Sequence, residues 1–99
     1  MKMTGNTVLI TGGGSGIGRA LAEAFHALGN KVIISGRRQS ALDEVTSANP
    51  GMVSVVLDAT KAENIRTFAE TLTRDHPDLN VVINNAGIMK NEDIPAAPD

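Results

Sequence analysis

A glycine-rich segment near the amino terminus contains the residues with the clearest chemistry. It runs from the apolar residues Val8–Ile10 through Thr11 to five glycines within positions 12–18. A tight strand-to-helix turn needs only one or two residues that tolerate positive φ, so five glycines indicate that another group approaches the backbone closely. The free N–H groups and positive dipole end of the helix that follows suit a phosphate. The segment therefore predicts a nucleotide phosphate site, with a purely structural turn as the simpler alternative.

A second candidate group, Gly36-Arg37-Arg38, follows the apolar run Lys31–Ile34. An Asp or Glu usually lies about 20 residues beyond the glycines, where it binds a free ribose 2′-hydroxyl. Here Gly36 offers no carboxylate, and the guanidinium groups of Arg37 and Arg38 could pair with a 2′-phosphate. The alternative is two solvated charges at the start of a helix, whose positive dipole end disfavours them. We therefore expect NADP rather than NAD, with Arg37 as the stronger candidate.

The elements around these groups follow a simple alternation. Four apolar runs predict strands buried on both faces of a parallel sheet: Thr7–Ile10, Lys31–Ile34, Val53–Leu57 and Asn80–Ile83. Between them, helical spacing appears at Ile17, Leu21, Ala24, Phe25 and Leu28, then over Ser40–Ala48, and then at Ile65, Phe68, Ala69 and Leu72. Thr60 and Glu63 predict a capping box for the third helix. The order βαβαβαβ is typical of an α/β, Rossmann-like, doubly wound sheet.

Three motifs in this order resemble those of the short-chain dehydrogenase/reductase family. They are Thr11-Gly12-x-x-x-Gly16-x-Gly18, Asp58 after the third strand, and Asn84-Asn85-Ala86-Gly87 after the fourth. The resemblance implies strand order 3-2-1-4 and covers only the N-terminal part of a family member, so we expect a domain truncated after its fourth strand. Residues 1–88 would form a partial NAD(P)-binding domain, and residues 89–99 a loop or disordered tail.

The resemblance also implies roles for individual residues. Gly12, Gly16, Ile17 and Gly18 would surround the pyrophosphate, and Asp58 would bind the adenine amino group. Ser15 could bond a phosphate oxygen, cap the following helix, or do both. Asn84, Asn85, Ala86 and Gly87 would line the adenosine ribose, although such asparagines can also simply satisfy their own turn.

Catalytic groups are missing from the sequence. Family members transfer hydride between the cofactor and an alcohol or carbonyl with a Tyr-x-x-x-Lys motif, and these 99 residues contain no tyrosine. His26 and His76 are expected at the surface, and no residue spacing suggests a metal site. The chain is therefore interpreted as the NADP(H)-binding portion of an oxidoreductase, inactive alone. The alternatives are a stand-alone nucleotide-binding or regulatory module and an interaction protein with a vestigial motif.

Composition sets the remaining expectations. A net charge of −2 gives no reason to expect nucleic acid or an anionic membrane as partner, and the absence of cysteine fits a reducing compartment. No apolar run near the amino terminus is long enough for a signal peptide, so a cytoplasmic location is expected. With no fifth strand to cover it, Asn80–Ile83 would be an unprotected edge, which predicts self-association as a homodimer or larger assembly.

Overall fold

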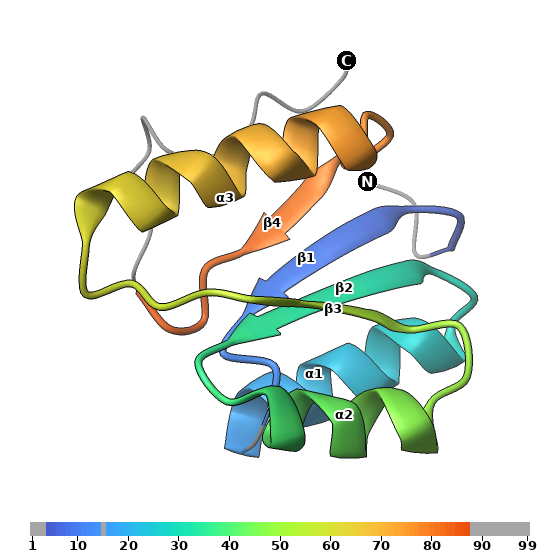
Figure 1. Cartoon of the computed structure of the whole chain (residues 1–99). Coiled ribbons are helices and arrows are strands. Elements are labelled where there is room, and N and C mark those ends of the chain that lie inside the picture. Colours follow the sequence, from blue (N-terminus) through green and yellow to red (C-terminus); the bar gives the residue numbers. More distant parts are fainter. Residues whose placement is uncertain (1–3, 15, 88–99) are drawn as a thin grey trace.

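The computed structural model describes residues 4–14 and 16–87 as a three-layered arrangement, with one parallel sheet between helices on both of its faces (Figure 1). The sheet has four strands in the order β3-β2-β1-β4, which confirms the predicted fold class and strand order. The strands are β1 (Thr7–Thr11), β2 (Lys31–Gly36), β3 (Val53–Val56) and β4 (Val81–Ile83). The helices are α1 (Gly16–Ala27), α2 (Gln39–Ala48) and α3 (Ala62–Asp75). Because all strands are parallel, their carboxyl ends lie along one edge of the sheet.

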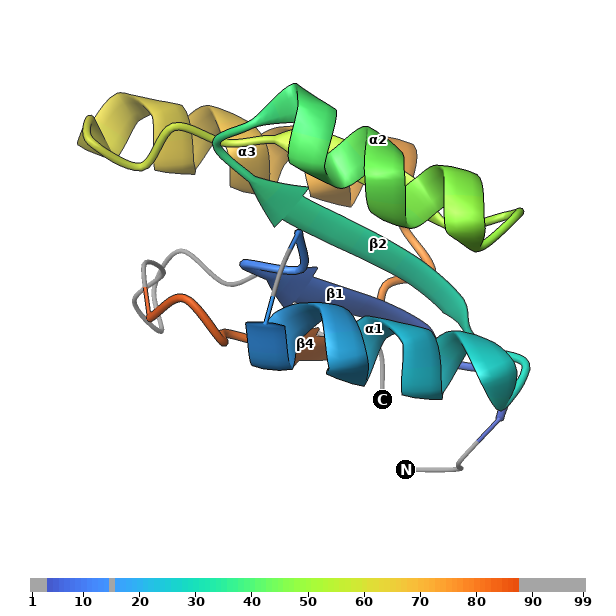
Figure 2. The same cartoon turned by 90° about the horizontal axis from the view of Figure 1, so that it is seen from below.

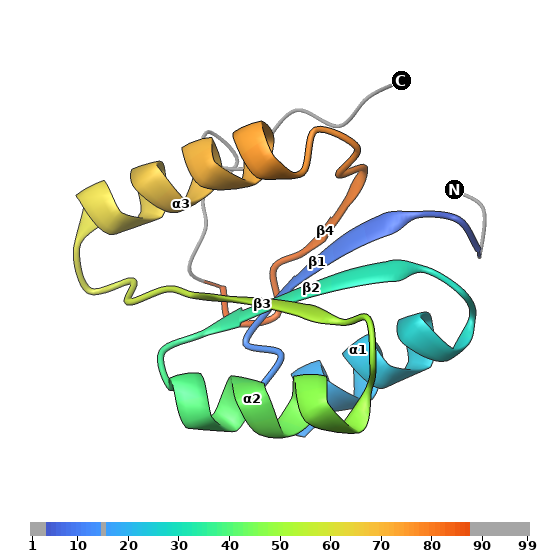
Figure 3. The ribbon, with the colours of Figure 1, turned by 45° about the vertical axis from the view of Figure 1, so that its right-hand side comes forward.

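The helices cover both faces of the sheet, α1 and α2 on one side and α3 on the other (Figures 2 and 3). Side chains alternate along the strands, so each face has its own apolar cluster. Val8, Ile10, Val32 and Ile34 pack with residues of α1 and α2. Leu9, Ile33 and Leu57 pack with Phe68 and Leu72 of α3. This double cover explains why the central strands read as continuous apolar runs.

The expectation of burial on both faces is confirmed for β1 and β2 and is wrong for the outer strands. β1 is buried throughout, and β2 is buried from Val32 to Ser35. β3 lies at one edge of the sheet, where Val53 and Val56 are exposed, and β4 is only half-buried. An edge strand has a neighbour on one side only, so apolar composition alone does not bury it.

The predicted helices are all present, but two details of their ends and faces differ. In α1 the buried residues are the small Gly18 and Ala22, whereas Ile17 in its first turn and Leu28 just after its end are exposed, contrary to the prediction from helical spacing. The capping box of Thr60 and Glu63 does not form. Lys61 is the N-cap of α3 and makes no side-chain cap bond, while the Thr60 N–H donates to Asp58.

A polar network joins the amino ends of three strands. The Thr7 N–H donates to Asn80 Oδ1 at 2.8 Å, and Asn80 Nδ2 donates to Asn6 Oδ1 at 3.0 Å. The Asn6 N–H donates to Asn30 Oδ1, so the residues preceding β1, β2 and β4 are tied together. The candidate site lies at the other end of these strands, where their carboxyl ends meet. Within the described residues, no helix has the length and apolar character needed to cross a membrane.

Candidate functional site

The glycine turn between β1 and α1 is built as a close backbone approach. Gly12 and Gly16 have φ of +70° and +59°, the left-handed region that favours glycine. The N–H groups of Gly12 and Gly13 both donate to the Ser35 carbonyl of β2, which fixes the turn above the sheet. A Cβ atom on Gly18 would lie 1.9 Å from the Gly12 oxygen, so α1 begins directly against the turn. Ser15 lies outside the described residues.

The start of α1 leaves room for a ligand. Apart from its chain neighbours and the backbone of its own helix, no described residue lies within 4 Å of a Cβ built on Gly16, and the Ile17 side chain is 74% exposed. The helix has no acidic residue in its first turn that would compete for its N–H groups. A glycine turn with open space before a helix N-terminus fits a pyrophosphate.

The turn after β4 lies beside the glycine turn and is bonded to it through Thr11. The Thr11 hydroxyl lies 3.3 Å from Asn84 Oδ1, and the Ala86 N–H donates to Thr11 Oγ1 at 3.1 Å. Asn85 Nδ2 donates to the Gly12 carbonyl oxygen at 3.4 Å. The turn also satisfies part of its own backbone, since the Gly87 N–H donates to the Asn84 carbonyl. These bonds show that the asparagine turn satisfies part of its own backbone and is joined to the glycine turn, while its contact with the ribose stays a prediction.

Two cavities flank the glycine turn at the end of β2. The first, of about 330 Å³, lies between the glycine turn and the start of α2, and Arg37 and Arg38 line it. Its other lining residues are Gly12, Gly14, Gly36, Ala41 and Leu42. The second, of about 190 Å³, shares Gly12, Gly36 and Arg37 with the first and is otherwise lined by Leu57, Ala59 and Ala86. An apolar slot beside a cationic cavity suits a flat base next to an anionic group.

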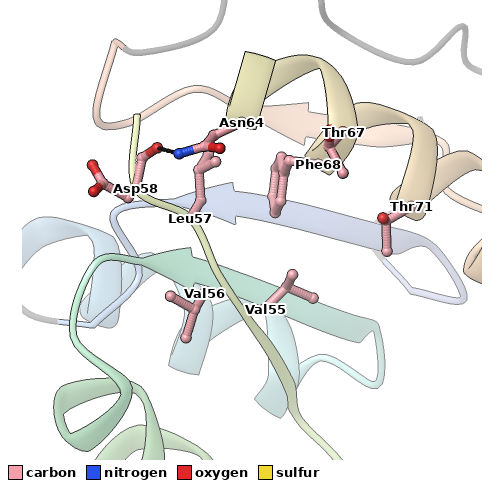
Figure 4. A pocket seen from close by; sticks show the side chains of 8 residues that line it. All are labelled: Val55, Val56, Leu57, Asp58, Asn64, Thr67, Phe68 and Thr71. Carbon is pink, nitrogen blue, oxygen red and sulfur yellow. Dashed lines mark hydrogen bonds between the residues drawn. The ribbon is translucent and has the colours of Figure 1, made fainter. Parts of the chain in front are cut away.

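Asp58 lies just after β3, at the mouth of a third cavity of about 320 Å³ between β3 and α3 (Figure 4). The Thr60 backbone N–H donates to Asp58 Oδ1 at 3.1 Å, and this bond, with the Thr60 hydroxyl and the charges of Arg37 and Lys61, holds the pKa of the Asp58 carboxyl below its usual value. Asn64 Nδ2 donates to the Asp58 carbonyl and fixes the backbone there. The exposed carboxylate therefore stays ionised and is able to accept a hydrogen bond from an amino group.

The histidines are less exposed than the sequence predicts. His26 is half-buried in α1, and a Cβ on Gly51 would lie 3.9 Å from its ring. His76 is the C-cap of α3 and is half-buried, and its Nδ1 has no hydrogen-bond partner. In residues 4–14 and 16–87, no three His, Cys, Asp or Glu side chains gather closely enough to bind a metal.

The structure adds residues to which the sequence reasoning gave no role of their own in the site. Thr11 joins the two turns, while Gly14, Ala41 and Leu42 form walls of the arginine cavity. Leu57 and Ala59 line the smaller cavity. Thr11 had a visible signal in its place before Gly12, whereas the wall residues are ordinary apolar positions of a strand end and a helix.

Comparison with known proteins identifies the class to which this fold and site belong. The model of the short chain dehydrogenase family matches residues 6–99. The chain belongs to this family of oxidoreductases, whose members bind NAD(P).

Individual relatives and solved structures show how similar the chain is to known proteins. The chain is 44% identical over 93 residues to the uncharacterized oxidoreductase DltE of Bacillus subtilis, covering 94% of this chain and 37% of that one. It is 31% identical to an NAD-dependent glycerol dehydrogenase of Listeria innocua, covering 95% of this chain and 39% of the relative. A crystal structure of a short chain dehydrogenase from Shigella flexneri complexed with NADP has a TM-score of 0.76 and 28% identity, covering 83% of this chain and 37% of that chain. The chain thus spans under half the length of these proteins.

Proposed function

We propose that this chain binds NADP(H) in preference to NAD(H). The observation behind the proposal is the cavity in which Gly36, Arg37 and Arg38 face the glycine turn, with no carboxylate among its lining residues. A 2′-phosphate on the adenosine ribose would meet guanidinium groups there, whereas a 2′-hydroxyl would find no acceptor carboxylate. The NADP complex of the Shigella relative supports the choice, and the NAD-dependent Listeria relative is the reason to test it.

Each part of the cofactor would contact residues that follow a different strand of the sheet. The glycine turn and Ile17 would hold the pyrophosphate, with Ser15 beside them. Arg37 and Arg38 would hold the 2′-phosphate, and Asp58 the adenine amino group. Asn85, Ala86 and Gly87 would border the ribose, because Ala86 lines the smaller cavity that also includes Gly12 and Arg37. The cofactor would supply a hydride to the whole enzyme, and these residues would bind and orient it.

Removing one guanidinium tests the proposal. One charge-assisted hydrogen bond contributes about 1.5–3 kcal/mol, or roughly ten- to a hundredfold in affinity. Arg37→Ala should weaken NADP binding by that factor and leave NAD binding nearly unchanged. Arg66→Ala, which removes an exposed cation from α3, is the matched control and should change neither affinity. An Arg37→Ala chain that keeps the full preference for NADP would contradict the proposal.

We further propose that the whole enzyme transfers hydride between NADP(H) and an alcohol or carbonyl substrate, as an oxidoreductase of this family, while the 99-residue chain only binds the cofactor. The sequence contains no tyrosine that could serve as the family's proton donor. Orienting a nicotinamide does not replace that group.

We also propose that the chain self-associates through β4. Val81, Val82 and Ile83 are half-buried at the end of the described sheet, opposite the edge formed by β3. No Lys or Pro interrupts β4, so little prevents another strand from pairing with it. Val82→Lys should convert a dimer into a monomer in light scattering at micromolar concentration. Val53→Lys, at the β3 edge, is the matched control and should leave the mass unchanged, and a monomeric starting protein would contradict this proposal.

A further inference from the structure

A group of polar side chains joins α1 to α2 on the solvent side of their shared layer. Arg19 Nη1 of α1 lies 3.1 Å from Glu44 Oε1 of α2, and Arg19 Nε lies 3.6 Å from Glu23 Oε1. Glu23 Oε2 in turn accepts a hydrogen bond from Asn49 Nδ2, just beyond α2, at 2.9 Å. Arg19 and Glu23 of one helix therefore bind both the middle and the end of the other helix.

This link lies one helical turn from the arginine cavity. A Cβ on Gly14 would lie 3.5 Å from the Ala41 Cβ, so the glycine turn and the first turn of α2 are in near contact. Ala41 and Glu44 are three residues apart and thus lie on the same side of α2. Gly12 and Gly14 of the glycine turn line the cavity together with Arg37, Arg38 and the first turn of α2. The width of the cavity therefore depends on how closely α2 lies against the start of α1.

We infer that the Arg19–Glu44 bridge is a positioning element that sets the width of the arginine cavity and so increases the preference for a 2′-phosphorylated cofactor. The inference rests on the proposed NADP preference. Arg19 and Glu44 act here through Arg37 and Arg38, whose guanidinium groups would move away from the glycine turn when α2 is released. A cofactor with a 2′-hydroxyl gains little from those groups, so its affinity is insensitive to the bridge.

Because Glu44 is negatively charged, its neutralisation distinguishes an effect of the bridge on the position of α2 from a direct electrostatic effect on the anionic cofactor. Removing a negative charge near a cavity for an anion should strengthen NADP binding if only Coulomb attraction matters. Removing the Arg19–Glu44 bridge should instead weaken NADP binding if the bridge holds α2 and the two arginines in position. Glu44→Gln therefore changes NADP affinity in opposite directions under the two explanations. The Glu44 side chain is 73% exposed, so this substitution leaves the core intact.

Asp43→Asn is the matched control. Asp43 also lies on α2, but its carboxylate accepts a hydrogen bond from Gln39 of the same helix at 2.7 Å and forms no ion pair with α1 among the described residues. The Asp43→Asn substitution removes the same charge one residue away from Glu44 and leaves the Arg19–Glu44 link between the helices in place.

The experiment is a calorimetric titration of the wild-type chain, Glu44→Gln and Asp43→Asn with NADP⁺ and with NAD⁺, together with thermal unfolding of each. We expect Glu44→Gln to lower the NADP/NAD affinity ratio by about three- to fivefold, the size that an exposed ion pair can contribute. Asp43→Asn should leave the ratio unchanged or raise it. A wild-type chain without NADP preference would overturn the proposed function and this inference together. A wild-type preference that Glu44→Gln leaves unchanged or increases, or that Asp43→Asn lowers equally, would overturn the inference alone.

Discussion

Gly18→Ala is the substitution whose cost follows most directly from the structure. The new methyl would lie 1.9 Å from the Gly12 carbonyl oxygen and 2.8 Å from Asn85 Nδ2. Forcing a methyl group into a packed site costs about 1–3 kcal/mol and occasionally more, and replacing glycine by alanine inside a helix returns about 1 kcal/mol. The main obstacle is backbone that other hydrogen bonds fix, so the cost should reach the upper part of that range. We expect a net loss of about 2 kcal/mol or more in the free energy of unfolding.

Such a loss is measurable by thermal unfolding followed by circular dichroism. For a domain of this size, about 2 kcal/mol corresponds to a fall in Tm of roughly 8–16 °C. Gly14→Ala is the matched control, because its Cβ would meet Ala41 at an ordinary 3.5 Å and Gly14 does not have a positive φ. It should leave Tm unchanged or raise it slightly. Equal Tm values for the two variants would refute the close approach of α1 to the glycine turn.

Three further predictions concern the polar network, acid stability and activity. Asn6→Ala should cost about 1–3 kcal/mol in urea unfolding, because the buried Asn6 side chain donates from Nδ2 to Asn30 Oδ1 and accepts from Asn80 Nδ2. The Thr7 hydroxyl, which donates to Asp78 at 2.8 Å, lowers the pKa of the Asp78 carboxyl, so its stabilisation is present above the unfolded pKa and disappears as the pH falls through the folded value. Asp78→Asn should therefore unfold more easily than wild type at pH 7, with the difference shrinking below about pH 4. The 99-residue chain should not oxidise NADPH with any of a panel of carbonyl compounds, and turnover that survives repurification would contradict the assignment of a binding role alone.

Much of the fold is predictable from sequence because its signals are local. The glycine turn, the helical spacing of apolar residues and the Val- and Ile-rich runs each identify an element within a few residues of its observed bounds. The strand order came from the family motifs, since nothing in the apolar pattern distinguishes a central strand from an edge strand. That is why the exposure of Val53 and Val56 was not predicted.

The parts that sequence reasoning missed depend on which of several possible polar contacts a residue makes, whether with a near or a distant partner. The capping box of Thr60 and Glu63 matches its pattern, but Asp58 binds the Thr60 N–H and Lys61 becomes the N-cap. Likewise, the Arg19–Glu44 bridge joins residues 25 positions apart, and neither residue has a local signal of its partner. Local patterns predict the helices and strands well. They do not show which of several possible hydrogen-bond or ion-pair partners a polar residue takes in the folded chain.

The central claim is that Arg37 and Arg38 recognise a 2′-phosphate, and two small ligands test it without the nicotinamide half of the cofactor. The wild-type chain would be titrated by calorimetry with adenosine 2′,5′-bisphosphate and with 5′-AMP, which differ only in the 2′-phosphate. Tighter binding of the bisphosphate by roughly ten- to a hundredfold is the predicted result. Equal affinities, or tighter binding of 5′-AMP, would contradict the account.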